Sequence, residues 1–272
     1  AIMSVITSAT SIGKYAFVYC EDLAFVSFLN EQTKIYEGAF SYCSSLLLIN
    51  LANASYIDAY AFAYTKITLL DLSNVTYIGD LAFLKESPTV ISELKLSEKL
   101  EDIGENPFAM CIVKPLKTTT KEIFNGIEYE KDAYTFELSE KVHIIDGNIF
   151  RVVPKGYELI TYTGTADTYE IPMETVRISA YAFAGNEIQR VVLPRTVSAI
   201  GHKAFYGCDK LLLVVFTSYD APVLEEEFDN AYFSSYEHFP STGEYTDFTD
   251  HDGNVVIING IEIVDYFMYN VA

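Results

Sequence analysis

Basic side chains are scarce in this chain. Its 272 residues include 18 Lys and Arg against 38 Asp and Glu, which gives a formal net charge of -20 at pH 7. A negative field of this size repels phosphate groups, so nucleic acids and anionic membrane surfaces are disfavoured as partners. Runs of about 18 apolar residues, which a membrane-spanning helix needs, are also missing. We therefore predict no nucleic-acid partner and no membrane insertion. The first residues lack the basic segment and apolar core of a secretory signal.

Side chains suited to catalysis or metal binding are equally sparse. There are four Cys and four His, without a CxxC pair, an HExxH or GxSxG motif or a phosphate-binding glycine loop. In a chain with 38 acidic residues, carboxylate pairs carry no information. We predict that the chain is not an enzyme and has no cofactor or metal. The segment 247–254 resembles half of a calcium loop, but Phe248 stands where the first ligand belongs, so an ordinary acidic turn is the alternative.

A hexapeptide that ends in Phe occurs seven times, and this repeat dominates the sequence. The copies are Ile12–Phe17, Ile35–Phe40, Ile57–Phe62, Ile78–Phe83, Ile103–Phe108, Ile178–Phe183 and Ile200–Phe205. Successive Phe residues are 23, 22, 21, 25, 75 and 22 residues apart. A fixed period near 22 residues is typical of stacked repeats, in which each unit buries its apolar face against its neighbours.

Each repeat contains two extended segments. The first has the pattern L-x-x-L-x-L, whose strands stack in parallel into one long sheet. It is seen at 46–51, 67–72, 188–193 and 211–216. The second leads into the hexapeptide, where a Gly often follows the Ile (Gly13, Gly79, Gly104 and Gly201) and is expected to occupy a corner with an unusual backbone angle. The Ala permits close approach of the chain, and the Phe fills the core.

All four cysteines share one phase of the repeat, three residues after a hexapeptide Phe. They are Cys20, Cys43, Cys111 and Cys208. Cys20 and Cys43 would lie in adjacent repeats roughly 5 Å apart, which is within disulfide reach. The interpretation that we favour is an internal ladder of small, half-apolar side chains that point inward in parallel.

The combined pattern I-G-x-x-A-F-x-x-C-x-x-L-x-x-[IV]-x-[LI]-P resembles the BspA-type leucine-rich repeat family, also called the Treponema pallidum-type. It is carried most fully by Ile12–Leu23 and Ile200–Leu211, and the resemblance covers about 12–111 and 171–216. The departures are Tyr36, Asp58 and Ser179 in place of Gly, and Pro107 in place of Ala. The resemblance implies a secreted or cell-surface protein that adheres to host proteins or to other bacteria.

We predict a β-rich leucine-rich repeat solenoid, a curved stack of ~22-residue repeats with a β-hairpin insertion and a C-terminal cap. The predicted parts are repeats at 1–111, divergent hairpin units at 112–177, further repeats at 178–216 and a β-rich cap at 217–272. The hairpin units are placed at 125–138, with a turn at Lys131–Asp132, and at 146–162, with a turn at Pro154–Gly156.

The candidate binding site lies on the outward positions of L-x-x-L-x-L, which are apolar where a solvated sheet would carry polar residues. Its residues are Phe25, Leu47, Leu48, Leu69, Val192, Leu212, Leu213 and Val215. Two alternatives remain at this point. The insert 112–170 or the tail packs over this face, or the strand register is shifted by one residue.

The function that we predict is non-catalytic recognition of a protein, a host or bacterial surface protein, through this sheet face, outside the cell or on its surface. The negative charge favours a basic partner and a salt-sensitive interaction. One alternative is a structural spacer that forms homo-oligomers through the apolar positions. Another is a glycan-binding or carbohydrate-active module that uses aromatic residues of the tail, namely Tyr232, Phe233, Tyr236 and Phe239.

Overall fold

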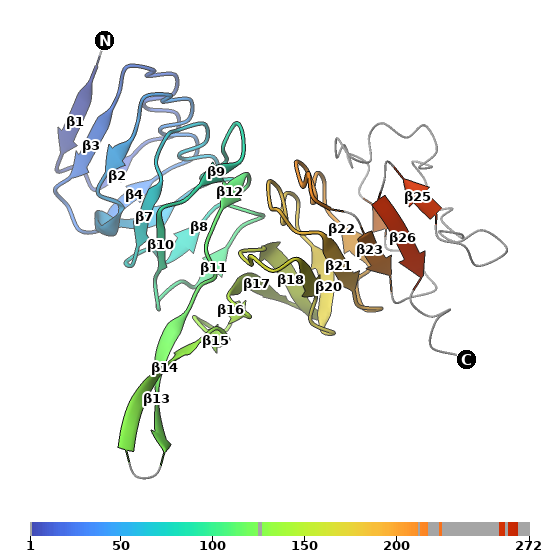
Figure 1. Cartoon of the computed structure of the whole chain (residues 1–272). Coiled ribbons are helices and arrows are strands. Elements are labelled where there is room, and N and C mark those ends of the chain that lie inside the picture. Colours follow the sequence, from blue (N-terminus) through green and yellow to red (C-terminus); the bar gives the residue numbers. More distant parts are fainter. Residues whose placement is uncertain are drawn as a thin grey trace, which may run out of the picture. The chain divides into compact units, whose positions relative to one another are not determined.

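The computed structural model describes residues 2–124, 127–211, 213–216, 223–224, 256–258 and 261–265. The chain is a β-solenoid of about 9 turns with repeats of about 22 residues, as predicted. It divides into two compact units, 1–152 with 162–164 and 153–161 with 165–272, which are described separately below (Figure 1). Among the described residues, one short 3-10 helix, η1 (Leu51–Asn53), accompanies the strands.

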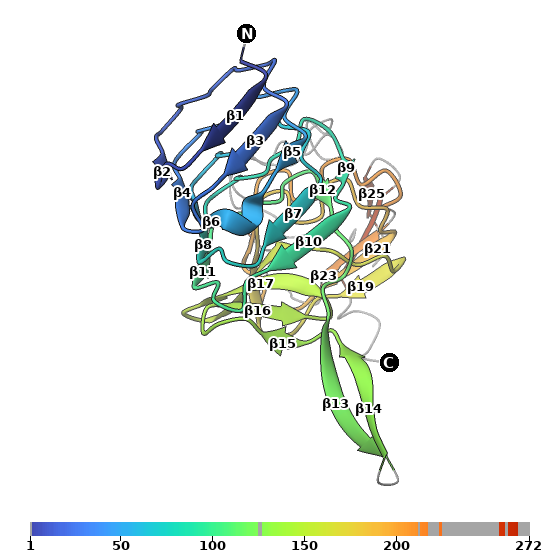
Figure 2. The same cartoon turned by 90° about the vertical axis from the view of Figure 1, so that its left-hand side faces the viewer.

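The first unit contains one row of strands from the L-x-x-L-x-L segments. β1 (Ser4–Thr7), β3 (Phe25–Phe28) and β5 (Leu48–Ile49) form one parallel sheet, and β7 (Leu69–Leu72) pairs with β10 (Glu93–Leu96) in another. Figure 2 shows these five strands side by side on one face. In β3 and β7 the inward positions are buried, for example Val26, Phe28 and Leu70, while Phe25 and Leu69 are exposed, so the predicted register is correct.

A second row of strands carries the Ile of each hexapeptide. Its members are β2 (Ser11–Ile12), β4 (Thr33–Ile35), β6 (Ala54–Ile57), β8 (Tyr77–Ile78) and β11 (Asp102–Ile103). The register aligns Ile12, Ile35, Ile57, Ile78 and Ile103 in one buried column. Identical side chains stack in this way because each turn repeats the geometry of the turn before it.

The Phe residues form a second internal column. The rings of Phe17, Phe40, Phe62, Phe83 and Phe108 stack with centroids 5.2, 5.4, 5.4 and 5.8 Å apart and interplanar angles of 10° or less. The backbone supports the same spacing, because the Phe40 N–H donates to the Ala61 carbonyl and the Phe83 N–H to the Pro107 carbonyl. The acceptor in this bond is the carbonyl of the residue before Phe. Pro107 can therefore replace Ala, since proline keeps its carbonyl.

Each corner contains a left-handed residue, but it is not the Gly that follows Ile. The positive φ values, 21° to 59°, fall two residues later, at Tyr15, Gly38, Tyr60, Leu81, Asn106, Tyr181 and Lys203. For a non-glycine residue this conformation costs about 1 kcal/mol. The N–H of that residue then reaches the next turn, as from Tyr15 to the Glu37 carbonyl and from Tyr60 to the Asp80 carbonyl, both at 2.9 Å. These bonds hold the residue in its strained conformation.

The Gly that follows Ile has no positive φ, so the expectation of an unusual backbone angle at this position was wrong. Glycine is needed there for a different reason. A Cβ at Gly79 would lie 2.3 Å from the Ala59 backbone nitrogen, and one at Gly201 would lie 2.4 Å from the Ala180 nitrogen. Real Cβ atoms do not approach other atoms so closely. Glycine is therefore required at these positions by the close approach of adjacent turns.

The insertion begins with a long hairpin, β13 (Thr118–Phe124) and β14 (Ile127–Ala133), which follows β9 (Thr89–Val90) and β12 (Cys111–Ile112). The hairpin was predicted, but its turn was misplaced. Lys131 and Asp132 lie inside β14, opposite Thr120 and Thr119, and the strands meet between positions 124 and 127. The second predicted turn is correct, since Pro154 and Lys155 form a turn between β17 (Asn148–Val153) and β18 (Gly156–Thr161).

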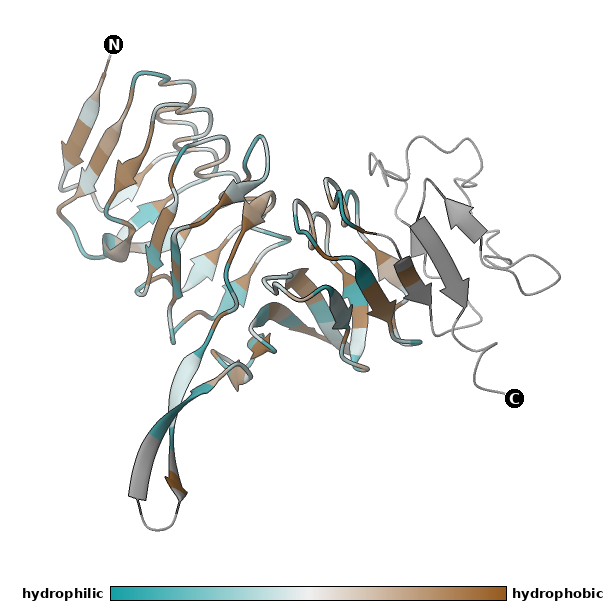
Figure 3. Cartoon of the chain, viewed as in Figure 1, coloured by the Kyte–Doolittle hydropathy of each residue, from teal (hydrophilic) through white to brown (hydrophobic). Residues whose placement is uncertain are grey.

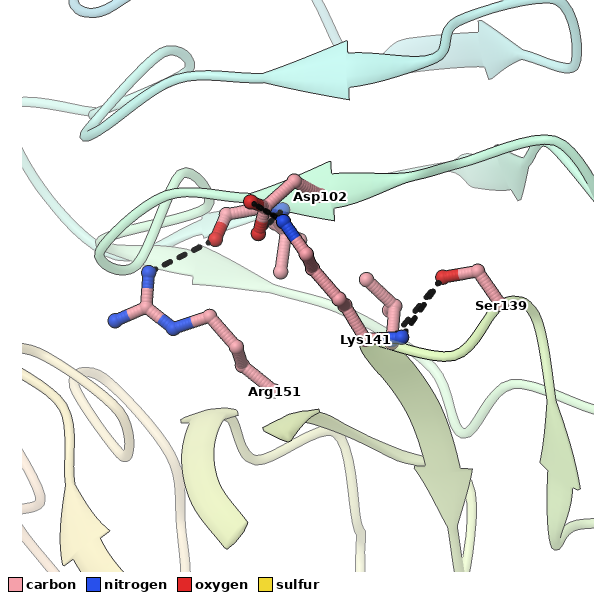
Figure 4. A network of polar contacts seen from close by, with 6 residues as sticks. Asp102, Ser139, Lys141 and Arg151 are labelled. Atoms are coloured by element: carbon pink, nitrogen blue, oxygen red, sulfur yellow. Dashed lines mark hydrogen bonds and ion pairs between the residues drawn. The ribbon is translucent and has the colours of Figure 1, made fainter. Parts of the chain in front are cut away.

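Polar contacts join the antiparallel strands that follow the long hairpin to β11 (Figure 4). β15 (Phe136–Glu137), β16 (Val142–Ile145) and β17 pair in sequence. From them, the Lys141 ammonium reaches Asp102 at 2.8 Å, and the Arg151 guanidinium donates to the Ile103 carbonyl at 3.0 Å (Figure 4). Asp102 and Ile103 belong to β11. The side chains thus join β16 and β17 to the column of Ile strands in the same unit.

The second unit repeats both rows. β18, β20 (Thr175–Ile178), β22 (Ala199–Ile200) and β24 (Val223–Leu224) form one row. The other row contains β19 (Thr168–Glu170), β21 (Arg190–Leu193), β23 (Leu213–Phe216), β26 (Ile261–Asp265) and β25 (Val256–Ile258). Phe183 and Phe205 stack at 5.0 Å. Strands β24, β25 and β26 fall within the predicted cap, whose boundaries, like those of the other predicted parts, stay predictions.

Candidate recognition surface

The outward positions of the first row of strands are apolar and exposed. The exposed fractions of Phe25, Leu47, Leu48 and Leu69 are 37%, 51%, 54% and 51%. These four side chains were predicted to face outward, and the structure places them there. Their exposure also shows that no described residue of the part of the insert within the first unit, 112–152, covers them.

The strand pairing brings these side chains together. Phe25 lies directly opposite Leu48, and the Leu47 N–H donates to the Ala24 carbonyl at 3.2 Å. The next turn follows closely, because the Lys66 N–H donates to the Leu46 carbonyl at 2.9 Å. Figure 3 shows that hydrophobic residues recur along the strands of this row. Side chains on one face of neighbouring strands lie close enough to form a continuous surface.

Sequence reasoning missed two members of this surface. Met3 and Ile6 are 69% and 66% exposed, and Ile6 lies opposite Ser27 in the pairing of β1 with β3. If the L-x-x-L-x-L pattern is continued one period upstream of Leu23, Val5 and Thr7 take the inward positions. Met3 and Ile6 then take outward positions, so this step would have revealed both. We call the combined set, Met3, Ile6, Phe25, Leu47, Leu48 and Leu69, the apolar strip.

The apolar strip is bounded by polar and charged side chains on the same face. The Asn50 amide accepts from the Phe28 N–H and donates to the Phe28 carbonyl, which completes the hydrogen bonds at the end of β3. On β7 and β10, Asp71 lies 3.7 Å from the Lys95 ammonium, which is 3.0 Å from Glu93. A hydrogen bond from the Ser73 hydroxyl lowers the pKa of Asp71, and Lys95 adds to the effect. An apolar centre with a charged rim is typical of protein-binding surfaces.

The other predicted residues belong to the second unit. Val192 is half-buried in β21. Leu213 and Val215 lie in β23, between β21 and β26, and only their backbone is described. Leu212 lies outside the described residues. The structure therefore brings together Phe25, Leu47, Leu48 and Leu69 in the first unit, and in the second unit it places Val192 opposite Val215. The binding role of all eight residues stays a prediction.

The cysteines form the expected ladder and all four are free, Cys20 and Cys43 included. The thiols of Cys43 and Cys208 donate to the carbonyls of Phe17 and Phe183, each at 3.0 Å, so each thiol binds the Phe carbonyl of the preceding turn. Burial raises the pKa of the Cys43 thiol to about 11 and the pKa values of Cys111 and Cys208 to about 12. A neutral, buried thiol is a poor nucleophile.

We expect these thiols to resist alkylation in the folded protein. With iodoacetamide at pH 8, Cys20, which is half-buried, should react first, while Cys43, Cys111 and Cys208 react only after denaturation in urea. Mass spectrometry of tryptic peptides measures the labelling of each residue. Rapid labelling of Cys111 without denaturant would contradict the ladder.

Lys85 is buried without a carboxylate partner among the described residues. It lies two residues after Phe83, where earlier turns place the stacked rings of Tyr19, Tyr42 and Tyr64. Its ammonium donates to the Thr65 carbonyl at 2.9 Å, and it is 3% exposed. Burial lowers the pKa of Lys85, because desolvation penalises the charged amine. Nothing in the repeat pattern indicated this burial.

The lowered pKa predicts a pH-dependent stability. Between the pKa of Lys85 in the folded protein and its ordinary value of 10.5, the unfolded chain binds more protons, so stability should rise with pH in this window. Lys85→Met should be more stable than the wild type by about 1 kcal/mol at pH 7. The difference should shrink as the pH approaches 10. Urea denaturation of both proteins from pH 7 to pH 10 measures it, and a constant difference would show that titration of Lys85 is not responsible.

Other candidate sites gain no support. In the part of the chain that the structure describes, no group of three His, Cys, Asp or Glu residues could hold a metal ion, and no helix is long and apolar enough to cross a membrane. The calcium-like segment 247–254 and the four tail aromatics, Tyr232, Phe233, Tyr236 and Phe239, lie outside the described residues.

Comparison with known families identifies the repeat. The family model for the BspA type leucine-rich repeat region matches residues 10–143, 74–168 and 156–244, so the chain belongs to the BspA-type leucine-rich repeat family. The resemblance read from the hexapeptide is thereby confirmed. A comparison with curated proteins finds no match.

Solved structures that match this chain do so at low sequence identity. A leucine-rich cell surface protein from Faecalibacterium prausnitzii A2-165 is 23% identical with a TM-score of 0.52, covering 79% of this chain and 60% of its own. A leucine-rich repeat protein from Eubacterium ventriosum is 14% identical with a TM-score of 0.50, covering 80% and 60%. The pneumococcal vaccine antigen PcpA is 18% identical with a TM-score of 0.49, covering 82% and 62%. The chain thus spans about 60% of the length of these structures.

Proposed function

We propose that this chain is a non-catalytic recognition module, located outside the cell or on its surface, that binds a protein partner through the apolar strip. The observation that carries the proposal is the exposure of Phe25, Leu47, Leu48 and Leu69 on one face of the first row of strands. The family membership and the surface location named for the Faecalibacterium protein support the assignment to the cell surface.

The apolar strip can supply most of the binding energy. Burying one Leu or Phe side chain that was fully exposed gains about 1.5–3 kcal/mol, and apolar residues at the centre of an interface usually dominate its affinity. The rim formed by Asp71, Glu93 and Lys95 would then orient the partner. The net charge of -20 attracts basic proteins, and dissolved salt screens this attraction. The association rate should therefore fall as the ionic strength rises.

The test is charge insertion into the apolar strip. Proteins captured from serum or extracellular matrix by the immobilised chain would be purified and measured individually by surface plasmon resonance. Leu48→Asp combined with Leu69→Asp should weaken binding of a purified partner by at least about a hundredfold, because two apolar contacts are lost and two charges are desolvated. Val90→Asp with Met173→Asp, at two exposed apolar residues outside the apolar strip, is the matched control and should bind like the wild type. Unchanged binding by the variant of the strip would contradict the proposal.

The same strip favours self-association as a second candidate function. An exposed apolar face of this kind can be buried against a second copy of the chain. In that case light scattering should show a dimer whose fraction increases with concentration, and Leu48→Asp with Leu69→Asp should abolish it. A wild-type monomer at every concentration would exclude the dimer.

A further inference from the structure

The first row of strands ends at β10, which leaves an open strand edge. Among the described strands, β10 pairs with β7 and with no other. The Glu93 N–H is directed to the Thr68 carbonyl of the β7 turn, at 3.4 Å. In a parallel ladder alternate residues bond to the same neighbour, so the N–H and C=O groups of Leu94 and Leu96 are directed away from β7. They face the place where the next turn would add a strand, but the chain continues into the hairpin β13–β14 instead.

A groove lies along this open edge. Its volume is 470 Å³, and it is lined by β10, by the segment 97–99, by the first residues of the insert and by β15 and β16. Leu94, Leu96, Phe136 and Leu138 contribute half-buried apolar side chains, and the buried Ile144 also lines it. Leu94 and Leu96 occupy inward positions of the repeat, which are buried in β3 and β7. Here they are half-exposed because the turn that would cover them is missing.

The polar lining of the groove is unusual for this chain. Lys95, Lys99 and Lys117 line it, against the single acidic residue Glu98, whereas acidic residues outnumber basic ones by 38 to 18 over the whole chain. Lys95 is paired with Glu93 and Asp71, and Lys117 is paired with Asp132 at 2.6 Å. These pairs are solvent-exposed and therefore weak, so a ligand carboxylate can replace one partner. Lys99 forms no ion pair with any described residue.

We propose that the open edge of β10 and this groove bind an extended acidic peptide segment of another protein by adding it as a strand. Main-chain hydrogen bonds to Leu94 and Leu96 would hold the peptide, as in other complexes in which a strand is added to a sheet edge. Successive side chains of a strand point to opposite faces. Alternate residues of the peptide would therefore enter the groove beside Leu96 and Phe136, while the residues between them lie beside Lys95. The preferred ligand alternates apolar residues with Asp or Glu.

A labelled peptide in which Val alternates with Glu is the probe. Fluorescence anisotropy with the full chain should show saturable binding that weakens as salt is added. Two control peptides test the two parts of the geometry. In the first control peptide Lys replaces every Glu, and this change should abolish binding. In the second, the backbone nitrogens that would face β10 are methylated, and the loss of their hydrogen bonds should also abolish binding. Equal binding of all three peptides would overturn the proposal, as would the absence of binding by the Val–Glu peptide.

Variants of the chain locate the site. Lys95→Glu with Lys99→Glu changes only exposed side chains, so the fold should survive, and it should weaken the probe by about tenfold or more. Lys14→Glu with Lys34→Glu, which changes the net charge by the same amount at two exposed positions beside the other row of strands, is the matched control and should change binding by about twofold at most. Equal effects of the two variants would show that binding depends on the net charge alone, which would contradict a binding site at β10.

The site can be separated from the apolar strip and from the chain's own acidic tail. Phe25→Asp with Leu48→Asp changes the apolar strip on strands that do not pair with β10, so peptide binding should stay intact whether or not the strip binds a partner. Loss of peptide binding in this variant would count against a separate groove. A photo-crosslinking residue introduced at position 136 should capture the labelled peptide. The tail of the chain contains the acidic run Glu225–Glu227. If mass spectrometry instead finds the cross-link within the chain, to these residues, the groove belongs to the tail and the proposal of an external ligand is wrong.

Discussion

Phe62→Ala should reduce the free energy of unfolding by about 3–5 kcal/mol. Phe62 is fully buried, and its ring is stacked at 5.4 Å on both Phe40 and Phe83. The substitution leaves a cavity in a core that has no other layer to fill it, and it removes two ring contacts worth about 0.5–1.5 kcal/mol each. Urea denaturation followed by circular dichroism measures the loss.

Phe17→Ala is the matched control for this experiment. Phe17 has the same position in its hexapeptide, but it is half-buried and stacks on Phe40 alone among the described rings. Its loss should cost about 1–2 kcal/mol, since less apolar surface returns to water. An equal or larger effect of Phe17→Ala would show that the stacked column does not determine stability.

Gly79→Ala should destabilise the protein by about 1–3 kcal/mol, whereas Gly13→Ala should stabilise it by about 0.4–1 kcal/mol. The two glycines occupy the same position of the hexapeptide, and neither has a positive φ. A Cβ at Gly79 would lie 2.3 Å from the Ala59 nitrogen, but a Cβ at Gly13 has nothing within 4 Å. Alanine at position 13 restricts the unfolded chain without creating a clash.

Thermal and urea denaturation of the two variants measure this contrast, and Gly201→Ala extends it to the second unit, where the Cβ would lie 2.4 Å from the Ala180 nitrogen. A similar change in stability for Gly13→Ala and Gly79→Ala would mean that the turns move apart freely. Tyr36, Asp58 and Ser179 occupy the same position in other turns. The close approach is therefore specific to particular pairs of turns, which is why a sequence pattern alone cannot assign it.

The part of the candidate site that could be predicted is the part that repeats. The inward positions of β3 and β7 are buried as expected, so Phe25 and Leu69 face outward on the alternate positions, and Leu48 does so because it lies opposite Phe25. Met3 and Ile6 follow the same rule but were missed, because no hexapeptide precedes them to mark the phase. The groove at β10 could not be predicted in this way. It exists because the repeat stops there.

By itself the sequence determined the solenoid, its period and the columns of Ile, Phe and Cys. It could do so because each turn stacks on a copy of itself, so a residue's neighbours are its own counterparts one period away. Only the tertiary structure decided where the left-handed residues lie, why Gly79 must be glycine, how Lys85 is buried and where β10 is left with an open edge. These features depend on contacts between parts of adjacent turns that are not identical, and no repeat pattern records such contacts.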